Sequence, residues 1–457
     1  MSDTVDLKSA VKNKDTTIFS REQKFLNRYN MYHDDYREQV KNRLVEIYQG
    51  AVELRLDRQM DLTNNIFKNI VDKISRVYSF GVNREINNDA FQEYLESSDY
   101  EKTMKQANRY LNGLNDILLQ VSWNSKTKEP KFIFRLPHKT RVKLDDDEVI
   151  EVEYFIQRDE DGNEKWAFWS DTEHYYKIYS KGSDDFTKEY PKGNEAGINP
   201  FNELPFLIMQ KGFRDGEFWD INKGDDLVEM TLDNSIYKTF KNYMIKWQSF
   251  KQVVVTGNNI GAISGQILDP QKALTIEGEG ASLSVLDLQA NIKELDETLD
   301  NNSNNVAINY NISPNQFRMT GAVSSGYALK MENKSLDEFT TEQQKDFVKY
   351  EKRAISLIAK AFEIFANIKY PSDVVVEFNE PYYAESKTEQ LASYEKEIEL
   401  GLNNPIQILQ NTKDIDENEA KKMYSENVEI RNQMQTKLNQ GNLNLETTQT
   451  ALEEANK

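Results

Sequence analysis

The sequence contains no cysteine and only three histidines in 457 residues. Without thiols the chain can form no disulfide, no thiolate nucleophile and no cysteine-based zinc site, and a reducing cytoplasm is its natural compartment. The histidines His33, His138 and His174 are far apart and form no HExxH or HxH pair. Zinc chemistry is therefore poorly supported, and we expect each histidine to be a surface or packed side chain.

Long apolar runs are also absent. The first residues, MSDTVDLKSAVKNKDTT, lack the apolar core of a secretory signal, and no stretch approaches the length of a membrane-spanning helix. We therefore expect a soluble protein with no membrane partner. Hydrophobic residues make up 38% of the chain and charged residues 29%. This balance and this length predict a surface-rich protein of several subdomains.

Basic residues are outnumbered, since 57 Lys and Arg stand against 76 Asp and Glu and give a formal net charge of −19. A field of this sign repels phosphate, so the whole chain is a poor candidate for holding nucleic acid by counterion release. DNA can still pass nearby without being held. The simplest interpretation of the acidity is that it keeps the protein in solution.

No catalytic or nucleotide-binding motif is present. GxxxxGK[ST] and a complete GxGxxG are missing, and no GxSxG elbow supports a Ser-His-Asp site, which the sequence alone does not exclude. The run Asp145-Asp146-Asp147 could bind a divalent cation through its oxygens. No complementary carboxylates lie nearby in the sequence, so a solvated hairpin tip is favoured. We predict no catalytic residue, no metal site and no cofactor.

Helical patterns dominate the first part of the chain, and a β-type pattern follows. Apolar spacing predicts helices over about residues 20–56, 61–79 and 88–122, the last broken near residues 97–99. Residues 128–215 hold aromatic and β-branched runs divided by turn signals, which indicate strands. The aromatic residues could stack on bases, but their alternation is more typical of a sheet core.

The second half of the sequence returns to helical patterns. Helices are predicted over about residues 224–250, 290–311 and 326–367, and the segment 251–289 is glycine-rich with short β-type runs. A strand follows in SDVVVEFNEP. Two possible capping boxes, Ser386 with Glu389 and Asp416 with Glu419, then open C-terminal helices.

Four lysines follow one another along the pattern that begins at residue 224: Lys238, Lys241, Lys246 and Lys251. In a monomer they would form an ordinary solvated helix face, which is the favoured interpretation. In a ring of subunits, the same face would repeat around an axis and give cationic bands in an acidic body. The sequence alone leaves both interpretations open.

The order of these elements resembles that of the portal, or head–tail connector, proteins of tailed double-stranded DNA bacteriophages. Three segments carry the resemblance: NNIFKNIVDKISRVYSFGV, LPFLIMQKGFRDGEFWDINKGDDLVEMTLDNSIYKTFKNY and NISPNQFRMTGAVSSGYALKMENKSLDEF. The likeness in element order spans about residues 64–379. The C-terminal region fits only loosely.

The resemblance implies an α+β, multi-subdomain portal fold with a mainly helical wing, stem and crown, a β-rich portion of the wing and a small α/β clip, assembled as a ring. The implied segments are the N-terminal arm and wing (1–223), a stem helix (224–250), the clip (251–289), a second stem helix (290–311), the tunnel loop (312–325), the long wing helix and strand (326–385), and the crown and C-terminal tail (386–457).

By the same resemblance, the tunnel loop projects into a DNA channel. The implied channel residues are Gln316, Arg318, Met319 and Thr320, and the stem lysines are further channel candidates. The implied hinge and helix cap are Gly321, Ser324, Ser325 and Gly326. Small groups with few charges suit such a loop, because strong phosphate contacts would slow passing DNA.

The implied function is non-enzymatic: a ring of about twelve subunits at one capsid vertex, through which the genome is packaged and ejected. The implied partners are other copies of the chain, the terminase large subunit, a head-completion or adaptor protein, the major capsid and scaffolding proteins, and double-stranded DNA that passes without sequence specificity. The implied location is the virion, with the host cytoplasm during assembly. Two alternatives are a metal-dependent nucleic-acid-processing enzyme and another capsid-associated adaptor.

Overall fold

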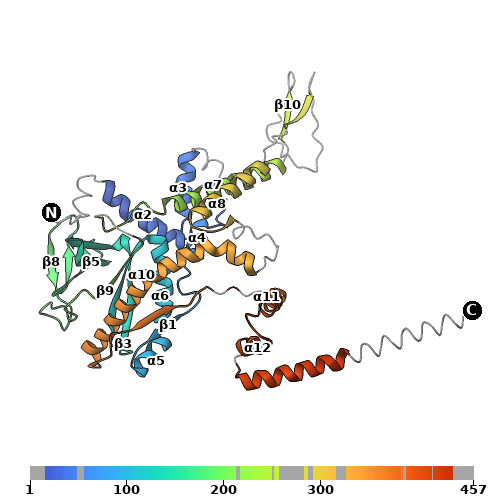
Figure 1. The fold of residues 1–457 in the computed structure, drawn as a ribbon. Coiled ribbons are helices and arrows are strands. Elements are labelled where there is room, and N and C mark those ends of the chain that lie inside the picture. Colours follow the sequence, from blue (N-terminus) through green and yellow to red (C-terminus); the bar gives the residue numbers. More distant parts are fainter. Residues whose placement is uncertain are drawn as a thin grey trace, which may run out of the picture. The chain divides into compact units, whose positions relative to one another are not determined.

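The computed structural model combines helices and strands, so the α+β class expected from the sequence is confirmed (Figure 1). The chain forms two compact units, a larger one of Met1–Gly321 with Asn333–Pro381 and a smaller one of Ala322–Glu332 with Tyr382–Lys457. The structure describes residues 16–48, 56–212, 217–249, 252–256, 282–286, 292–314, 326–381, 383, 387–413 and 415–435.

The N-terminal helical region of the larger unit consists of α2 (Thr16–Tyr32) and α3 (Arg37–Ile47). The chain turns between them at Asp34, whose φ of 62° no helix accommodates. After the short η2 (Leu56–Arg58), α4 (Ile66–Ile74) is capped by Asn65, whose side chain accepts a hydrogen bond from the Lys68 amide. This helix is shorter than the predicted 61–79, because a cap fixes its start and the chain leaves the helix at Ser75.

The next two helices are α5 (Asp89–Ser97) and α6 (Tyr100–Leu114), and the predicted break between them is confirmed. The prediction that helix continues to residue 122 is wrong. Asn115, with a φ of 66°, ends α6, and β2 (Asp116–Asn124) follows directly. The first six residues of β2 are buried, as in a strand covered on both faces, and such a continuous apolar run is not distinguished from a buried helix by periodicity.

The β-rich region predicted over residues 128–215 is confirmed as two antiparallel sheets. The first has the order β3-β2-β9, with β3 (Glu129–Arg135) and β9 (Phe206–Gln210) on either side of β2. The second holds five strands in chain order: β4 (Thr140–Asp145), β5 (Glu148–Arg158), β6 (Glu164–Ser170), β7 (His174–Tyr179) and β8 (Phe186–Glu189). The short η3 (Pro137–Lys139) joins the two sheets.

The turns and aromatic residues of the five-stranded sheet agree with the sequence. Asp146 and Asp147 have φ values of 45° and 64° and form the β4–β5 turn, which confirms the hairpin tip. Tyr154 and Trp169 belong to the main hydrophobic core, so the expectation of a sheet core holds for both. On the other face of the sheet, the Arg141 guanidinium lies 3.9 Å from the centre of the Trp166 ring.

Two clusters of buried apolar side chains stabilise the larger unit. The first packs β2 and α6 against residues 347–362 of the long helix α10 (Gly326–Ala366), and includes Leu118, Leu111 and Ile355. The second packs α3 and α4 against the start of α7 (Asp225–Ser249). A two-stranded sheet of β1 (Val82–Glu85) and β12 (Val375–Phe378) ties the chain after α10 back to the N-terminal half.

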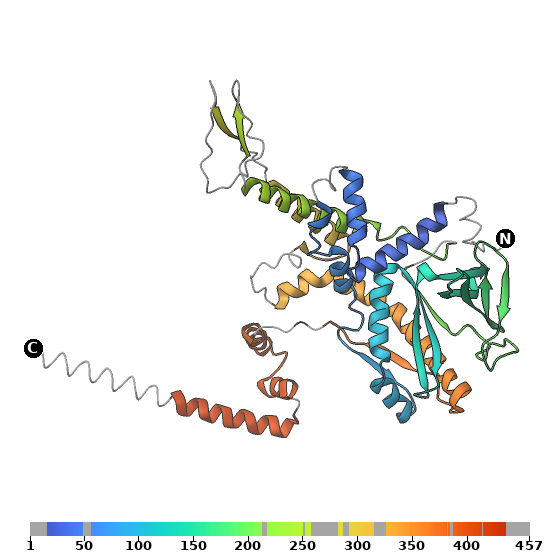
Figure 2. The ribbon, with the colours of Figure 1, turned by 180° about the vertical axis from the view of Figure 1, so that it is seen from behind.

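A helix pair extends from the body of the larger unit. α7 and α8 (Ile292–Asn309) lie side by side, and β10 (Gln252–Thr256) pairs antiparallel with β11 (Ser282–Leu286) beyond their far ends (Figures 1 and 2). The chain thus leaves the body along α7 and returns along α8, and the β10–β11 pair lies between these helices in the sequence.

The described part of the smaller unit is helical. It contains the first turns of α10, then α11 (Lys387–Glu399), α12 (Pro405–Lys413) and a helix over residues 417–435. Asp416 accepts hydrogen bonds from the Asn418 and Glu419 amides, so the predicted helix start there is confirmed, whereas Ser386 lies outside the described residues. Among the residues described in this unit, only Ala420 is buried.

Candidate functional site

The two paired helices have complementary charge. In α7 the acidic residues occupy the first half, which suits the positive end of the helix dipole, and the lysines occupy the second half. In α8 the acidic residues also fall in the first half. Because the two helices run in opposite directions, the basic half of α7 lies beside the acidic half of α8. Lys241 forms an ion pair with Asp296 across this contact, at 2.5 Å.

Two of the three described stem lysines, Lys241 and Lys246, bond to a polar group of the same chain. Lys246 donates a hydrogen bond to the Gln59 side chain at 2.7 Å. Burial raises the pKa of Asp61, but hydrogen bonds from Thr63 and Asn242 and the charge of Lys238 outweigh it, so that the pKa is lowered. Lys246 is exposed and Lys238 and Lys241 are partly exposed, so a solvated helix face and a face in a ring both stay predictions. That they face a channel stays a prediction, and Lys251 lies outside the described residues.

The predicted tunnel loop falls almost wholly outside the described residues, which include neither the channel residues Gln316, Arg318, Met319 and Thr320 nor Gly321, Ser324 and Ser325. Gly326 is the first residue of α10. The start of the loop region is anchored in the larger unit. Asn311, with a φ of 61°, ends the last turn after α8, and Ile312 is buried in the second core cluster.

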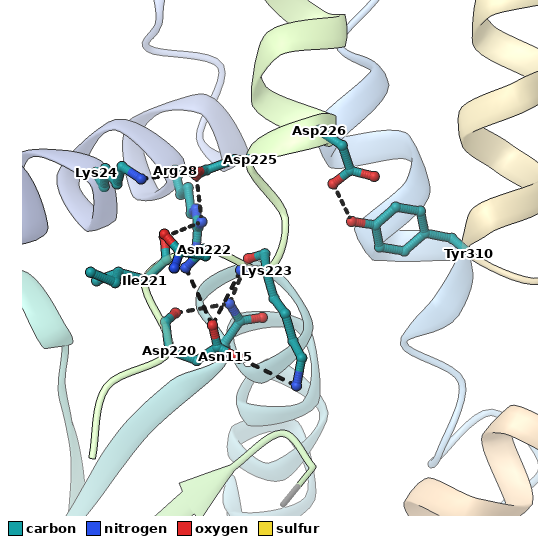
Figure 3. A network of polar contacts seen from close by, with 10 residues as sticks. All are labelled: Lys24, Arg28, Asn115, Asp220, Ile221, Asn222, Lys223, Asp225, Asp226 and Tyr310. Atoms are coloured by element: carbon teal, nitrogen blue, oxygen red, sulfur yellow. Dashed lines mark hydrogen bonds and ion pairs between the residues drawn. The ribbon is translucent and has the colours of Figure 1, made fainter. Parts of the chain in front are cut away.

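A polar network fixes the base of α7 to the N-terminal region (Figure 3). The Arg28 guanidinium donates hydrogen bonds to the Ile221 carbonyl at 2.9 Å and to Asp225 Oδ1 at 2.7 Å, and its side chain is 1% exposed. Lys24 contacts the other oxygen of Asp225 at 2.8 Å. The first residue of α7 is thereby held by two cations of α2.

The same network reaches two further elements (Figure 3). The Asn115 amide group donates to the carbonyls of Asp220 at 3.1 Å and of Lys223 at 2.6 Å, which fixes the segment before α7 to the junction of α6 and β2. The Tyr310 hydroxyl donates to Asp226 Oδ1 at 2.7 Å and links the ends of α7 and α8. Burial, and then the bond to Asp226, raise the pKa of Tyr310 well above its usual range.

A half-buried lysine lies beside this base. Lys211, directly after β9, places its ammonium 5.9 Å from the centre of the Tyr310 ring and 5.7 Å from that of Phe339. Burial first, and then the charge of the neighbouring Lys223, lower its pKa to about 8. Lys211 thus lies where the end of β9, the base of the helix pair and α10 come close to one another.

Sequence reasoning missed this network. Arg28 has the spacing of an ordinary helix residue, and nothing in its neighbourhood indicates partners almost two hundred positions away. Asn115 gives a weak signal, because asparagine tolerates a positive φ and often ends a helix.

The metal-dependent enzyme alternative would need several acidic or histidine side chains to converge. Among the described residues, no three His, Asp and Glu side chains gather in a group that could hold a metal ion. The structure does bring His33 and His138 close to one ring, since their centroids lie 4.5 Å and 5.5 Å from that of Tyr29. None of the described helices is long and apolar enough to cross a membrane.

Comparisons with known proteins give low similarity. No family model matches the chain, and no curated protein matches it. Three solved structures contain chains that are 9% identical to it. In the virion of a native gene transfer agent particle the TM-score is 0.40, with 79% of this chain and 93% of that chain covered. In the neck of the native particle computed with C12 symmetry, the TM-score is 0.41, with 78% of this chain and 90% of that chain covered. In the neck of the empty particle computed with C6 symmetry, the TM-score is 0.39, with 76% of this chain and 89% of that chain covered. TM-scores this low do not establish a common fold.

Proposed function

We propose that the chain is the subunit of a portal ring of about twelve copies, through which double-stranded DNA enters and leaves a capsid. The observation that carries the proposal is the helix pair. α7 and α8 extend from the body, a β-hairpin closes them, and a long helix follows, in the order that the sequence resemblance to portal proteins implies. The buried network around Arg28 and Asn115 supports this role, because it gives the pair a fixed base.

In this proposal, α7 and α8 are stem helices that pack against the same helices of neighbouring subunits. The segment around β10 and β11 is the clip, which contacts the terminase during packaging and head-completion proteins afterwards. Residues 312–325 are the tunnel loop, the body with α10 is the wing, and the smaller unit includes the crown. The motor activity comes from the terminase, consistent with the absence of a P-loop from the sequence.

Electron microscopy of the purified full-length chain tests the proposal. We expect negatively stained particles to be rings of roughly twelve subunits with a central hole. Monomers or fibres at every protein concentration would overturn it. Metal-dependent cutting of DNA that Asp145→Asn abolishes would instead favour the enzyme alternative.

The substitution Arg318→Ala distinguishes a portal from another ring-forming adaptor. The variant should still assemble into rings, because a single cation of the proposed tunnel loop should contribute little to subunit contacts. It should change the amount of DNA packaged or retained, because a ring of cations beside the DNA is lost. A particle-packaging assay measures this, with Lys126→Ala on an exposed turn as the matched control. Loss of ring assembly in Arg318→Ala would show that the loop assignment is wrong.

A further inference from the structure

A cavity of about 210 Å³ lies where α2 meets the connection between the two sheets. Four aromatic residues line it, Tyr29 from α2, Phe134 from β3, and Tyr154 and Phe155 from β5. The charged or titratable side chains around it other than tyrosine are all basic, namely Arg135, His138 and Lys139, and no acidic residue is among the described ones that line it. In a chain with a net charge of −19, such a lining is unusual.

Arg135 is one of the residues that line this cavity. Its guanidinium carbon lies 3.5 Å from the centre of the Tyr154 ring, and its Nε donates a hydrogen bond to the Gln120 side chain at 2.9 Å. Burial lowers its pKa, opposed only by the Tyr154 hydroxyl. Among its described partners there is therefore no carboxylate.

Two buried arginines of the larger unit provide a contrast. Arg28 is bonded to Asp225, and Arg84 is bonded through two nitrogens to the buried Glu351. A desolvated guanidinium is costly without an anionic partner, which explains both pairings. Arg135 differs in that its guanidinium contacts Tyr154 and Gln120 and is paired with none of the described carboxylates.

His138 also lines the cavity and carries a buried polar atom. Its Nδ1 is buried and has no hydrogen-bond partner among the described residues. Burial lowers the pKa of His138 to about 4, so that at neutral pH the ring is uncharged and offers either a donor or an acceptor. The hydroxyl of Thr140, by contrast, is already bonded to the Leu136 carbonyl at 2.8 Å.

We propose that this cavity binds a small carboxylic acid with a planar, aromatic or unsaturated body. A guanidinium presents parallel N–H groups that match the two oxygens of a carboxylate. The aromatic walls from α2, β3 and β5 suit a planar carbon skeleton, which would stack or pack edge to face. The small volume restricts the ligand to about the size of a single substituted ring.

Occupation of the cavity would connect three parts of the larger unit. The ligand would contact α2 through Tyr29, the end of the three-stranded sheet through Arg135, and the five-stranded sheet through Tyr154. Because the ligand would bind only the folded state, it would also stabilise the connection between the two sheets. This site does not depend on ring assembly, so its test is independent of the portal proposal.

Isothermal titration of the full-length chain with sodium benzoate at neutral pH tests the proposal. We expect saturable binding to one site per chain. Benzamide, which has the same shape but no charge, should bind about tenfold more weakly or worse. Arg135→Gln should weaken benzoate binding by about tenfold or more, and Arg135→Lys, which keeps the charge but not the planar fork, should also weaken it. The matched control Arg431→Gln replaces an exposed arginine of the smaller unit and should leave binding unchanged.

Three results would overturn the proposal. The first is no saturable benzoate binding by the wild-type chain, a measurement that depends on no variant. The second is equal affinity for benzoate and benzamide. The third is undiminished benzoate binding by Arg135→Gln with an unchanged circular dichroism spectrum. Tighter binding of inorganic phosphate than of benzoate would overturn the assignment to carboxylates.

Discussion

Glu351 joins the long helix α10 to three residues of the larger unit that are distant in the sequence. Its carboxylate is fully buried in α10 and accepts two hydrogen bonds from Arg84 of β1, at 2.8 Å and 2.9 Å. It also accepts one from the Tyr78 hydroxyl at 2.6 Å and one from Tyr100 of α6 at 2.8 Å. Burial, followed by the charge of Glu351, raises the pKa of both tyrosines well above the usual range, so each stays a donor.

Removing this charge should destabilise the larger unit strongly. Glu351→Gln keeps the size of the side chain but leaves the Arg84 guanidinium buried without an anion, which should cost about 3–5 kcal/mol. Urea unfolding measures the loss, and Glu342→Gln on the exposed face of α10 is the matched control. A loss no greater than in the control would mean that the network adds nothing to stability.

His174 should make the five-stranded sheet sensitive to acid. Its ring stacks on Trp169 with a centroid distance of 3.6 Å, and burial lowers its pKa to about 4. The unfolded chain binds a proton near pH 6.5, so the stability contributed by the neutral ring is complete above that pH and is lost as the pH falls toward 4. Between pH 7 and pH 5 the loss should be about 2 kcal/mol for this histidine.

The measurement is urea unfolding at pH 7 and pH 5, followed by tryptophan fluorescence. His174→Gln should be less stable than the wild type at pH 7 and should show a smaller decrease at pH 5. An equal decrease in the two proteins would rule out His174 as the cause. His138, whose pKa is also about 4, contributes in the same direction and remains in both proteins.

At the scale of residues, the sequence predicted the kind of environment that a side chain has but not the residues that it contacts. It predicted packed or surface histidines, and His174 is indeed packed. It could not predict the Glu351 network, because Arg84 and Tyr78 lie more than two hundred and sixty positions from Glu351. Local periodicity holds no information about contacts at such separations.

Helices and strands were predicted well where the amino-acid composition and the spacing of the apolar residues indicated the same kind of element. The helices near residues 225–249, 292–309 and 326–366 have strong apolar spacing and clear breakers at their ends, and each was found close to its predicted place. β2 was missed because its two buried faces remove the alternation on which strand prediction depends. The base of the helix pair was missed because its contacts join four elements that are distant in the sequence.

The pairing of α7 with α8 makes a prediction at the scale of elements. Lys241→Glu places like charges beside Asp296 and should lower the unfolding free energy by about 1 kcal/mol, because both side chains are only partly exposed. The double variant Lys241→Glu with Asp296→Lys restores an opposite pair and should recover most of the loss.

A double-mutant cycle by thermal unfolding measures this coupling. Lys293→Glu, which changes a highly exposed lysine of α8, controls for the change in net charge. If the double variant were no more stable than Lys241→Glu alone, the ion pair would not contribute to the association of the two helices.

The two units of the molecule differ in where their large apolar side chains lie. The larger unit buries two apolar clusters, whereas the smaller unit leaves many large apolar side chains in solvent: Leu329, Met331, Leu391, Ile398, Leu400, Leu402, Tyr424, Ile430 and Met434. Exposed apolar residues at this density are typical of surfaces that another protein covers. In the proposed ring, neighbouring copies cover them.

Ring assembly should therefore depend on these residues and on salt. Leu400 and Leu402 are 69% and 70% exposed, so Leu400→Asp with Leu402→Asp should leave the folding of a single chain nearly unchanged. The same change should reduce the ring fraction, because carboxylates would be buried between subunits that already carry a net charge of −19.

Raising the salt from about 20 mM to about 200 mM should favour wild-type rings, since screening weakens repulsion while apolar contacts persist. Sedimentation velocity measures both effects, with Leu400→Ala and Leu402→Ala as the apolar control. Rings that form equally well in the aspartate variant would show that assembly does not require this surface.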